Sequence, residues 1–319
     1  MSSNSTKPRR FDREVDGILL LDKPQGMSSN AALQQARVLF RAVKAGHAGS
    51  LDPMATGMLP ICFGQATKVC GFLLDSRKSY RFTAKLGEQT DTGDADGTIT
   101  ARKSVPVLTH AAVTSLLAAS IGEQLQVPPM YSALKHQGQR LYDMARRGEN
   151  VERVPRTINI ASMRLLGLTS DELDVEVVCS KGTYIRTLAE DLAVKLDTVA
   201  HLSRLRRIQV DPFDGACMVT LDALTELAAN GVAGLDSLLV PSERALPQLP
   251  LVEVDASGMQ ALLLGKTVKT SSLQASAEPY GNKLVRMTAE SGQFLGIGEV
   301  TASGEIQPRR LFVKSATSQ

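Results

Sequence analysis

The segment from Gly46 to Gly57 places one carboxylate in a loop that is rich in glycine. It reads Gly-His-Ala-Gly-Ser-Leu-Asp-Pro-Met-Ala-Thr-Gly, and its glycines and proline disfavour a continuous helix or strand. Pro53 restricts Asp52 to extended backbone geometry, which limits the directions that the carboxylate can take. A carboxylate held in this way could serve as a nucleophile or as a general base. An Asp-Pro pair is also common in plain turns, so spacing alone leaves that alternative open.

Short elements on both sides of this loop must position it. The apolar run Gly17–Asp22 predicts a buried strand, which Lys23-Pro-Gln-Gly26 closes with a turn. Ser28 and Ser29 are N-cap candidates for a helix that ends near Val43. After the loop, the pattern predicts a strand over 58–63 and a helix over 65–74.

Alternation and helical spacing continue through the middle of the chain. The patterns predict strands over 80–86 and 173–179, a helix over 183–196, and a strand over 202–210 that carries three arginines. Strands and helices are mixed without a regular βαβ repeat. We therefore expect an α+β fold with a mixed, largely antiparallel sheet in the catalytic domain.

Composition shifts suggest where the chain is divided. Residues 1–16 are polar and charged and are expected to form a disordered leader. Three prolines between Pro241 and Pro250 suggest a linker, after which short alternating segments predict a small β-rich domain. The expected division is a leader over 1–16, a catalytic domain over 17–245 and a small domain over 250–314.

The composition of the 319-residue chain narrows its class. It has 36 Lys and Arg against 33 Asp and Glu, a net charge of +3, which neither requires nor excludes a nucleic-acid partner. No signal peptide and no apolar run of membrane-spanning length are visible, so we expect a cytoplasmic protein. The four cysteines contain no CxxC pair and are expected to be small core residues, without metal or disulfides.

The loop with Asp52 closely resembles the catalytic loop of the TruB family of pseudouridine synthases, in which the aspartate before proline is essential. The resemblance extends over most of the chain, because four more segments look like that family's motifs in the same order: Gly17–Ser29, Tyr80–Phe82 with Leu86–Gly97, Pro128–Lys135 and Cys179–Thr187. Two departures are visible beside the aspartate, where many relatives have threonine and this chain has Ala48 and Ser50.

The resemblance implies that the chain isomerises uridine 55 in the T loop of tRNA to pseudouridine. The target base is flipped out of the stack, its glycosidic bond is rearranged, and Asp52 is the catalytic carboxylate. The reaction needs no redox agent or nucleotide, so no cofactor and no metal are expected. Asp52 could attack the ribose, attack the base, or start an elimination toward a glycal, and the sequence leaves all three open.

The resemblance also implies the other site residues. Arg186 would be the ionic partner of the catalytic carboxylate, whose pKa would otherwise rise on burial; the alternative is a solvated helix arginine. Tyr80 would stack on the uracil, against the alternative of a core aromatic on a strand. His47 would pack against the T loop, and Tyr184 and Leu205 would line the uracil pocket.

Clustered positive charge is expected to hold tRNA, the implied partner. The candidates for this basic track are Lys135, Arg140, Arg146, Arg147, Arg204, Arg206 and Arg207. The end of the chain, with Arg309, Arg310 and Lys314, resembles a PUA-type RNA-binding domain. We expect a monomer that needs no protein partner. The rivals are a tRNA-binding module without catalysis and a guide-RNA-dependent synthase subunit.

Overall fold

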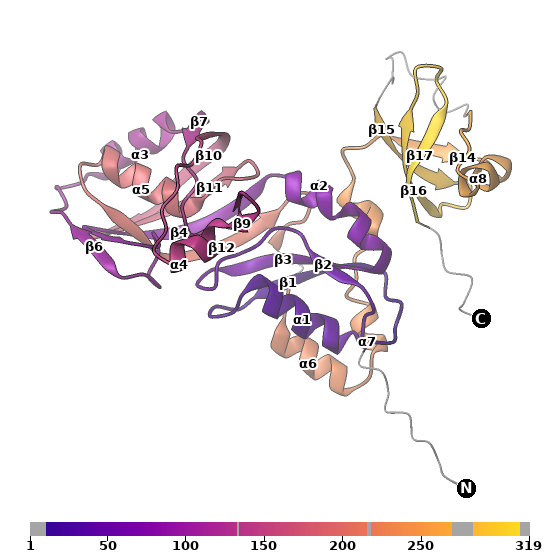
Figure 1. The fold of residues 1–319 in the computed structure, drawn as a ribbon, viewed down its shortest axis with the longest axis horizontal. Coiled ribbons are helices and arrows are strands. Elements are labelled where there is room, and N and C mark those ends of the chain that lie inside the picture. The colour runs from indigo at the N-terminus through magenta and orange to yellow at the C-terminus, as the bar shows by residue number, and fades with distance from the viewer. Residues whose placement is uncertain (1–10, 133, 216–217, 270–282, 313–319) are drawn as a thin grey trace, which may run out of the picture.

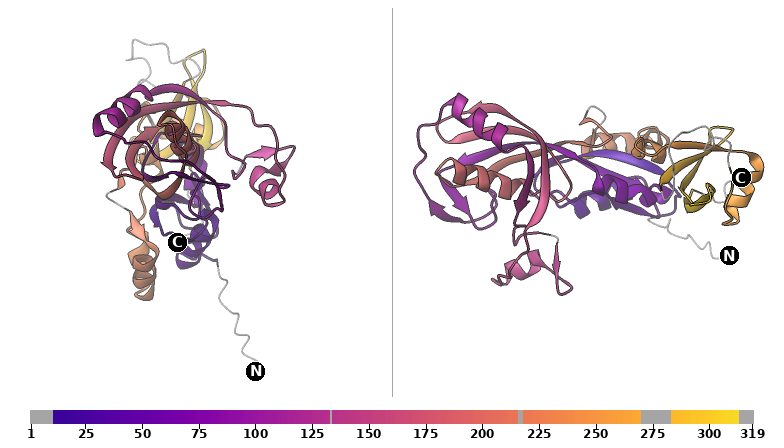
Figure 2. Two further views of the ribbon diagram at one scale, coloured as in Figure 1. Left: turned by 90° about the vertical axis from the view of Figure 1, so that its left-hand side faces the viewer. Right: turned by 90° about the horizontal axis from the view of Figure 1, so that it is seen from above.

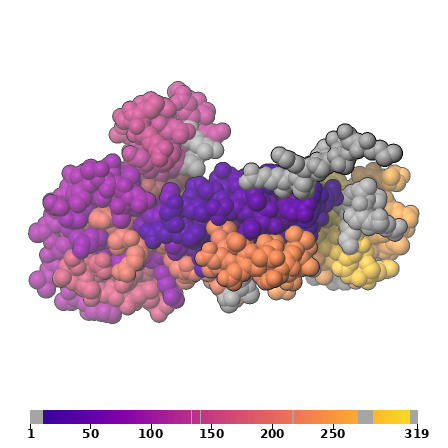
Figure 3. All heavy atoms as spheres, turned by 90° about the horizontal axis from the view of Figure 1, so that it is seen from below, coloured from indigo at the N-terminus to yellow at the C-terminus, as the bar shows by residue number. Residues whose placement is uncertain are grey.

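The computed structural model describes residues 11–132, 134–215, 218–269 and 283–312 (Figure 1). A large sheet with helices on its faces forms most of the molecule, and a smaller sheet lies at one end of the long axis. A lobe that contains β8, β9 and α4 projects from the large sheet, as the view from above shows (Figure 2). The space-filling view shows the same elongated outline with the lobe standing out from it (Figure 3).

The large sheet has the strand order β13-β1-β3-β12-β4-β11-β10-β7, and β2 pairs with β3. Its strands are β1 (Gly17–Lys23), β2 (Ala45–His47), β3 (Thr56–Phe63), β4 (Lys78–Leu86), β7 (Gly122–Gln126), β10 (Arg156–Leu168), β11 (Glu172–Cys179), β12 (Ala200–Val210) and β13 (Val219–Thr220). Two hairpins lie outside it, β5 (Glu88–Thr90) with β6 (Ile99–Arg102), and β8 (Lys135–His136) with β9 (Gln139–Arg140).

The helices of this part are α1 (Ser29–Leu39), α2 (Cys70–Asp75), α3 (His110–Ala119), α4 (Leu141–Arg146), α5 (Ile185–Lys195), α6 (Leu221–Ala229) and α7 (Ala233–Asp236). The 3-10 helices η1 (Gly64–Val69) and η3 (Ser242–Ala245) complete it. The expected helix over 65–74 is therefore split between η1 and α2.

The large sheet consists of two halves that meet at a short parallel contact between β3 and β12. Only Arg206 with Thr56 and Arg207 with Gly57 are paired there, whereas β1 and β3 pair along their whole length and β4 pairs with β12 and β11 along most of theirs. Gly57 has φ +100°, and a Cβ atom on it would lie 2.1 Å from the Arg207 carbonyl oxygen. This approach therefore requires glycine.

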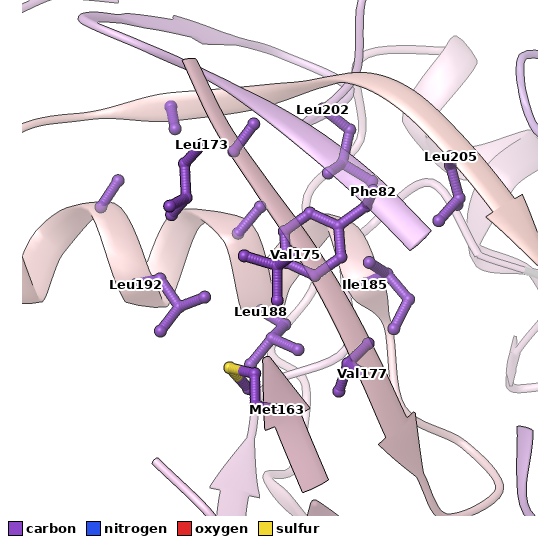
Figure 4. Close-up of a cluster of buried hydrophobic side chains, with 14 of the residues drawn as sticks. Phe82, Met163, Leu173, Val175, Val177, Ile185, Leu188, Leu192, Leu202 and Leu205 are labelled. Atoms are coloured by element: carbon purple, nitrogen blue, oxygen red, sulfur yellow. The ribbon is translucent and has the colours of Figure 1, made fainter. Parts of the chain in front are cut away.

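Each half has its own hydrophobic core. In one half, α5 packs on β4, β11 and β12, and the side chains of Phe82, Val175, Leu188 and Leu202 meet in the interior (Figure 4). In the other half, apolar residues of β1 and β3 pack against α1 and α6. The loop with Asp52 precedes β3 and therefore lies where the two halves join.

Most of the strands predicted from alternation are confirmed, including β1, β3, β4, β11 and β12. The helix expected to end near Val43 ends at Leu39 instead. Arg41 has φ +53°, which takes the backbone out of the helix and turns the chain toward β2. Strand β2 thus occupies the beginning of the segment that was expected to be a loop.

Residues 11–16 and 241–250 differ from expectation. The end of the expected disordered leader is packed, since Arg13 bridges to Ala42 and Val15 is 5% exposed. The expected linker holds η3, and Leu246 is fully buried in the same cluster as Ile18. In both segments an apolar side chain packs into a hydrophobic cluster, Val15 in one and Leu246 in the other. Composition alone does not predict this packing. Residues 1–10 lie outside the described residues.

The small sheet follows, with the order β14-β15-β16-β17. Its elements are β14 (Leu251–Val254), α8 (Ala256–Leu263), β15 (Leu284–Ala289), β16 (Phe294–Val300) and β17 (Ile306–Leu311). Leu284, Phe294 and Ile297 pack against the cluster that contains Leu73, and Lys68 Nζ donates to the Leu311 carbonyl at 2.5 Å. The expected α+β class with a separate β-rich end is confirmed.

The part of the chain that the structure describes contains no helix both long and apolar enough to span a membrane. Of the cysteines, Cys62 and Cys179 are buried and Cys70 is partly buried, all with free thiols. Cys217 lies outside the described residues.

Candidate active site

A cavity of about 300 Å³ opens at the junction of the two halves of the sheet. The loop before β3, the start of α5, and strands β4 and β12 all contribute to its wall. The structure thus brings together five of the predicted site residues, Asp52, Tyr80, Tyr184, Arg186 and Leu205. Its size is at the small end of the range for ligand pockets, roughly 300 to 1,000 Å³.

Asp52 and Arg186 form an ion pair at this cavity. Arg186 Nε lies 3.0 Å from Asp52 Oδ2; the arginine side chain is 5% exposed, whereas the aspartate side chain keeps 39% of its surface accessible. The two terminal nitrogens of Arg186 donate to the carbonyl oxygens of Thr92 at 2.7 Å and Tyr131 at 2.6 Å. The guanidinium is therefore fixed by backbone acceptors, and it orients a carboxylate that remains open to the cavity.

Burial raises the pKa of Asp52, and the positive charge of Arg186 opposes this rise. Asp94, whose Oδ2 lies 3.9 Å from Arg186 Nε, raises the pKa of Asp52 further through its negative charge. Arg186 therefore offsets the cost of burying the carboxylate only in part.

Ser29 and the turn after β1 hold the loop that carries Asp52. Ser29 Oγ accepts a hydrogen bond from Leu51 N at 2.7 Å and donates one to Leu51 O at 3.0 Å. Gly26 N donates to Pro53 O at 2.8 Å. Of the two residues that flank Asp52 in the chain, Leu51 is thus bonded to the first residue of α1 and Pro53 to the turn before that helix.

Lys23 is a fully buried lysine at the end of β1. Its Nζ donates to Pro24 O at 2.8 Å and to Met27 O at 2.7 Å, and lies 3.4 Å from Pro53 O. Burial lowers the pKa of Lys23 to about 8, and the negative charge of Asp52 opposes that shift. Lys23 therefore places a second positive charge near the Asp52 carboxylate. Its hydrogen bonds also stabilise the turn after β1.

The two tyrosines of the cavity are held differently. Tyr80 lies on β4 and packs against the core, and burial raises its pKa. Tyr184 precedes α5, and the side-chain amide of Gln126 bonds its backbone twice, accepting from Tyr184 N at 2.8 Å and donating to Tyr184 O at 3.1 Å. Tyr80 is therefore carried by a strand, whereas the backbone of Tyr184 is held by the last residue of β7.

His47 is not among the residues that line the cavity. It lies on β2, opposite Ile61 of β3, and is partly buried. Burial and the positive charge of Arg207 lower its pKa, which favours the neutral ring. Its Nδ1 is buried and has no hydrogen-bond partner in the part of the chain described here.

The arginines expected to form one basic track on β12 are divided between two faces. Arg204 and Arg206 point outward and pair with Glu172 at 3.3 Å and Asp22 at 2.7 Å. Arg207 points inward and is only 1% exposed, so the expectation that it contacts phosphates is wrong. Alternation along the strand places Arg207 on the same side as Leu205.

The remaining track candidates lie on the projecting lobe, and the basic residues of the PUA-like end lie on or beyond the small sheet. Lys135, Arg146 and Arg147 line a hollow of the lobe, and the Arg146 guanidinium lies 4.5 Å from the Tyr142 ring centre. Arg309 pairs with Glu299 at 2.5 Å. The side chain of Arg140 and the whole of Lys314 lie outside the described residues.

Sequence reasoning missed Lys23, Ser29 and Gln126 as residues that shape the site. Ser29 was a cap candidate, yet it is Ser28 whose side chain caps α1. A buried lysine within an apolar run was the available signal for Lys23, because such a charge requires partners. Gln126 gave no signal, since it acts on a residue far along the chain. In the described residues, no group of three or more His, Cys, Asp or Glu could hold a metal ion.

Three domain models of known families match consecutive parts of the chain. The N-terminal domain model of TruB family pseudouridylate synthases matches residues 37–185, which include Asp52 and Tyr80. The tRNA pseudouridylate synthase B C-terminal domain model matches 186–247, and the pseudouridine synthase II TruB C-terminal model matches 250–312. The chain belongs to the TruB family.

Relatives of high identity show the same family, and a solved structure shows the same fold. The chain is 50% identical to tRNA pseudouridine synthase B of Stutzerimonas stutzeri over 95% of its own length and 97% of the relative's. It is 48% identical to the protein of that name from Chromohalobacter salexigens, over 95% and 96%. A chain of an H/ACA RNP bound to a substrate RNA shares the fold, with a TM-score of 0.71 at 20% identity over 96% and 86% of the two chains.

Proposed function

We propose that this TruB family member converts uridine 55 in the T loop of tRNA to pseudouridine, with Asp52 as the catalytic carboxylate. The observation that carries the proposal is the ion pair between Asp52 and Arg186 at the cavity, in which the arginine is buried and the carboxylate is accessible. The identity of 46–50% to proteins named tRNA pseudouridine synthase B supports tRNA as the substrate.

The reaction is an isomerisation whose atoms and electrons balance within the nucleotide. The bond between N1 and C1′ breaks, a bond between C5 and C1′ forms, C5 loses a proton and N1 ends with one. The protein must therefore supply a carboxylate, a place in which the detached uracil can turn, and groups that exchange protons. A cofactor has no part in this balance.

The other cavity residues have roles that follow from their positions. Arg186 would keep Asp52 ionised against the effect of burial, and Tyr80 would stack on the flipped uracil beside the carbon that loses its proton. Tyr184 and Leu205 would complete the wall around the base. His47 lies outside this wall and, as a neutral partly buried ring, would pack against the rearranged T loop.

We propose that tRNA is held by positive charge away from the cavity. The hollow in the lobe carries Lys135, Arg146 and Arg147, and the small sheet would act as a PUA-like RNA-binding domain over 250–314. The catalytic domain would then extend past 245, because Leu246 is buried against it. We propose further that the protein works in the cytoplasm as a monomer without a guide RNA or protein partner.

The test is incubation of the purified chain with an unmodified tRNA transcript, followed by mapping of pseudouridine at single-nucleotide resolution. Product at uridine 55 without added RNA or protein is the expected result. Binding without product would favour a tRNA-binding module, and product only with an added guide RNA would favour a guide-dependent subunit. A transcript with cytidine at position 55 serves as the control.

A further inference from the structure

Arg207 is the largest of the fully buried side chains in the described residues, and it carries a charge. Its Nε donates to Met58 O at 2.7 Å, and its Nη2 donates to Gly49 O at 3.0 Å. Within the described residues no carboxylate lies in ion-pair contact with it. Burying a guanidinium without a carboxylate is costly, so hydrogen bonds must replace the lost water.

The surrounding backbone makes room for this side chain. Gly49 has φ +90°, and a Cβ atom on it would lie 3.4 Å from Arg207 Nη1. Gly57, at the other end of the same loop, lets β3 approach the backbone of Arg207 itself. Gly49 and Gly57, at the two ends of the segment that carries Asp52, thus both lie close to Arg207.

Arg207 also reaches Tyr80. The two residues are directly paired across β12 and β4, and both line the cavity with Asp52. The positive charge of Arg207 opposes the rise that burial produces in the pKa of Tyr80. One arginine therefore bonds the loop of the carboxylate and strand β3, and its neighbour across the sheet is the tyrosine of the site.

We propose that Arg207 is a positioning residue for the reaction, which fixes the Tyr80 hydroxyl relative to the loop that carries Asp52. This inference rests on the proposed function. Because directly paired residues of neighbouring strands lie on the same face of the sheet, the guanidinium lies beside the phenol, limits its orientation and stabilises negative charge on its oxygen. The guanidinium also donates to Gly49 O. A movement of the loop that carries Asp52 would therefore move Arg207 and, through it, the Tyr80 ring.

The experiment compares Arg207→Lys and Arg207→Ala with Arg164→Lys, a change at an exposed position of β10 that does not line the cavity. Single-turnover rates at saturating tRNA, tRNA dissociation constants and Tm are measured for each. We expect Arg207→Lys to lose about 10²-fold in rate with affinity within about threefold, since displacement by 1 Å can have that effect. Guanidinium ion should restore part of the rate of Arg207→Ala, whereas Arg164→Lys should keep the wild-type rate with or without guanidinium.

A double-mutant cycle with Tyr80→Phe separates positioning from general support of the fold. Non-additive effects on the rate are expected if Arg207 acts through Tyr80. Additive effects, an unchanged rate in Arg207→Lys, or weaker binding at an unchanged rate would each overturn the inference, the last by making Arg207 a phosphate contact. If Arg207→Ala does not fold, the Lys variant decides. An inactive wild-type chain would instead refute the proposed function.

Discussion

The hydroxyl of Ser29 is bonded to both backbone groups of Leu51, the residue before the candidate catalytic carboxylate. Ser29 is 4% exposed, so neither bond can be replaced by water without rearrangement. The Ser29 side chain at the start of α1 thereby fixes the backbone of the loop immediately before Asp52.

Ser29→Ala should lower both stability and turnover. It leaves the N–H and C=O of Leu51 without partners in a buried place, which costs about 1–3 kcal/mol. The neighbouring Ser28→Ala is the matched control, because it removes the α1 cap and costs about 1 kcal/mol without touching the loop. Chemical denaturation and single-turnover rates are compared. Equal losses of rate in the two variants would contradict a special role for Ser29.

Asp52→Asn should abolish turnover, by about 10⁴-fold or more, while tRNA affinity stays nearly unchanged. The amide keeps the size of the side chain but cannot act as a nucleophile or base. Pseudouridine mapping and equilibrium binding measure the two effects. Asp22→Asn, which changes a carboxylate paired with Arg206 on the other face, tests whether any nearby loss of charge has the same result. Retained turnover in Asp52→Asn would refute the catalytic assignment.

Arg186→Ala should impair turnover by about 10²-fold to 10³-fold, because it removes the charge that keeps Asp52 ionised and orients it. The pH at which activity is half-lost on the acid side should move upward, since burial would then act on Asp52 with less opposition. A rate–pH profile is the measurement. Weaker tRNA binding with an unchanged rate would instead make Arg186 a phosphate contact.

The pH dependence of activity should fall on both sides. Asp52 has a raised pKa, so its required charge is lost on acidification at a higher pH than for an ordinary aspartate. On the alkaline side Lys23, with a pKa of about 8, loses its proton and its attraction for the carboxylate. Lys23→Gln should therefore remove the alkaline decline. Lys78→Gln, at a buried lysine that also has a pKa of about 8, should keep it.

Truncation tests the small sheet, and the structure determines where the chain can be cut. Val240 exchanges two hydrogen bonds of 2.8 Å with Ile18, so a chain that ends at Leu239 would damage β1. A chain that ends at Leu249 should fold, bind tRNA more weakly and lose about 0.9 from its salt slope for each lost phosphate contact. Arg309→Ala with Arg310→Ala in the full chain controls for lost packing. Unchanged affinity and slope would leave the small sheet without an RNA-binding role.

The sequence predicted much of the fold where one local pattern decides the structure. Strand β11 alternates strictly between half-buried and buried residues, β4 alternates between apolar and polar residues from Tyr80 to Leu86, and the apolar run of β1 is buried on both faces. Strand β2 and the end of α1 were missed, because both depend on the left-handed backbone of Arg41 and on pairing with β3.

The motifs predicted the residues that line the candidate site. They did not predict the residues that hold those in place, which are Lys23, Ser29 and Gln126. Asp52 and Arg186 were both expected, and their contact is a fact of tertiary structure that neither segment shows alone. Arg207 was placed among surface arginines because three arginines close together suggest a basic surface. The alternation that puts Leu205 in the core also puts Arg207 there, so the pattern on the strand was a better guide than the charge.

The contact between β3 and β12, where the two halves of the sheet meet, also determines how early during synthesis the site can form. Arg207 follows Gly49 by 158 residues and Arg206 follows Asp22 by 184, so the contacts that surround the loop connect distant parts of the chain. Closing such separations slows folding and delays it until the later strands exist. On a ribosome, the segment with Asp52 emerges long before β12 is made. A nascent chain can therefore expose this carboxylate without being able to use it, and catalysis begins only after almost the whole catalytic part has been synthesised.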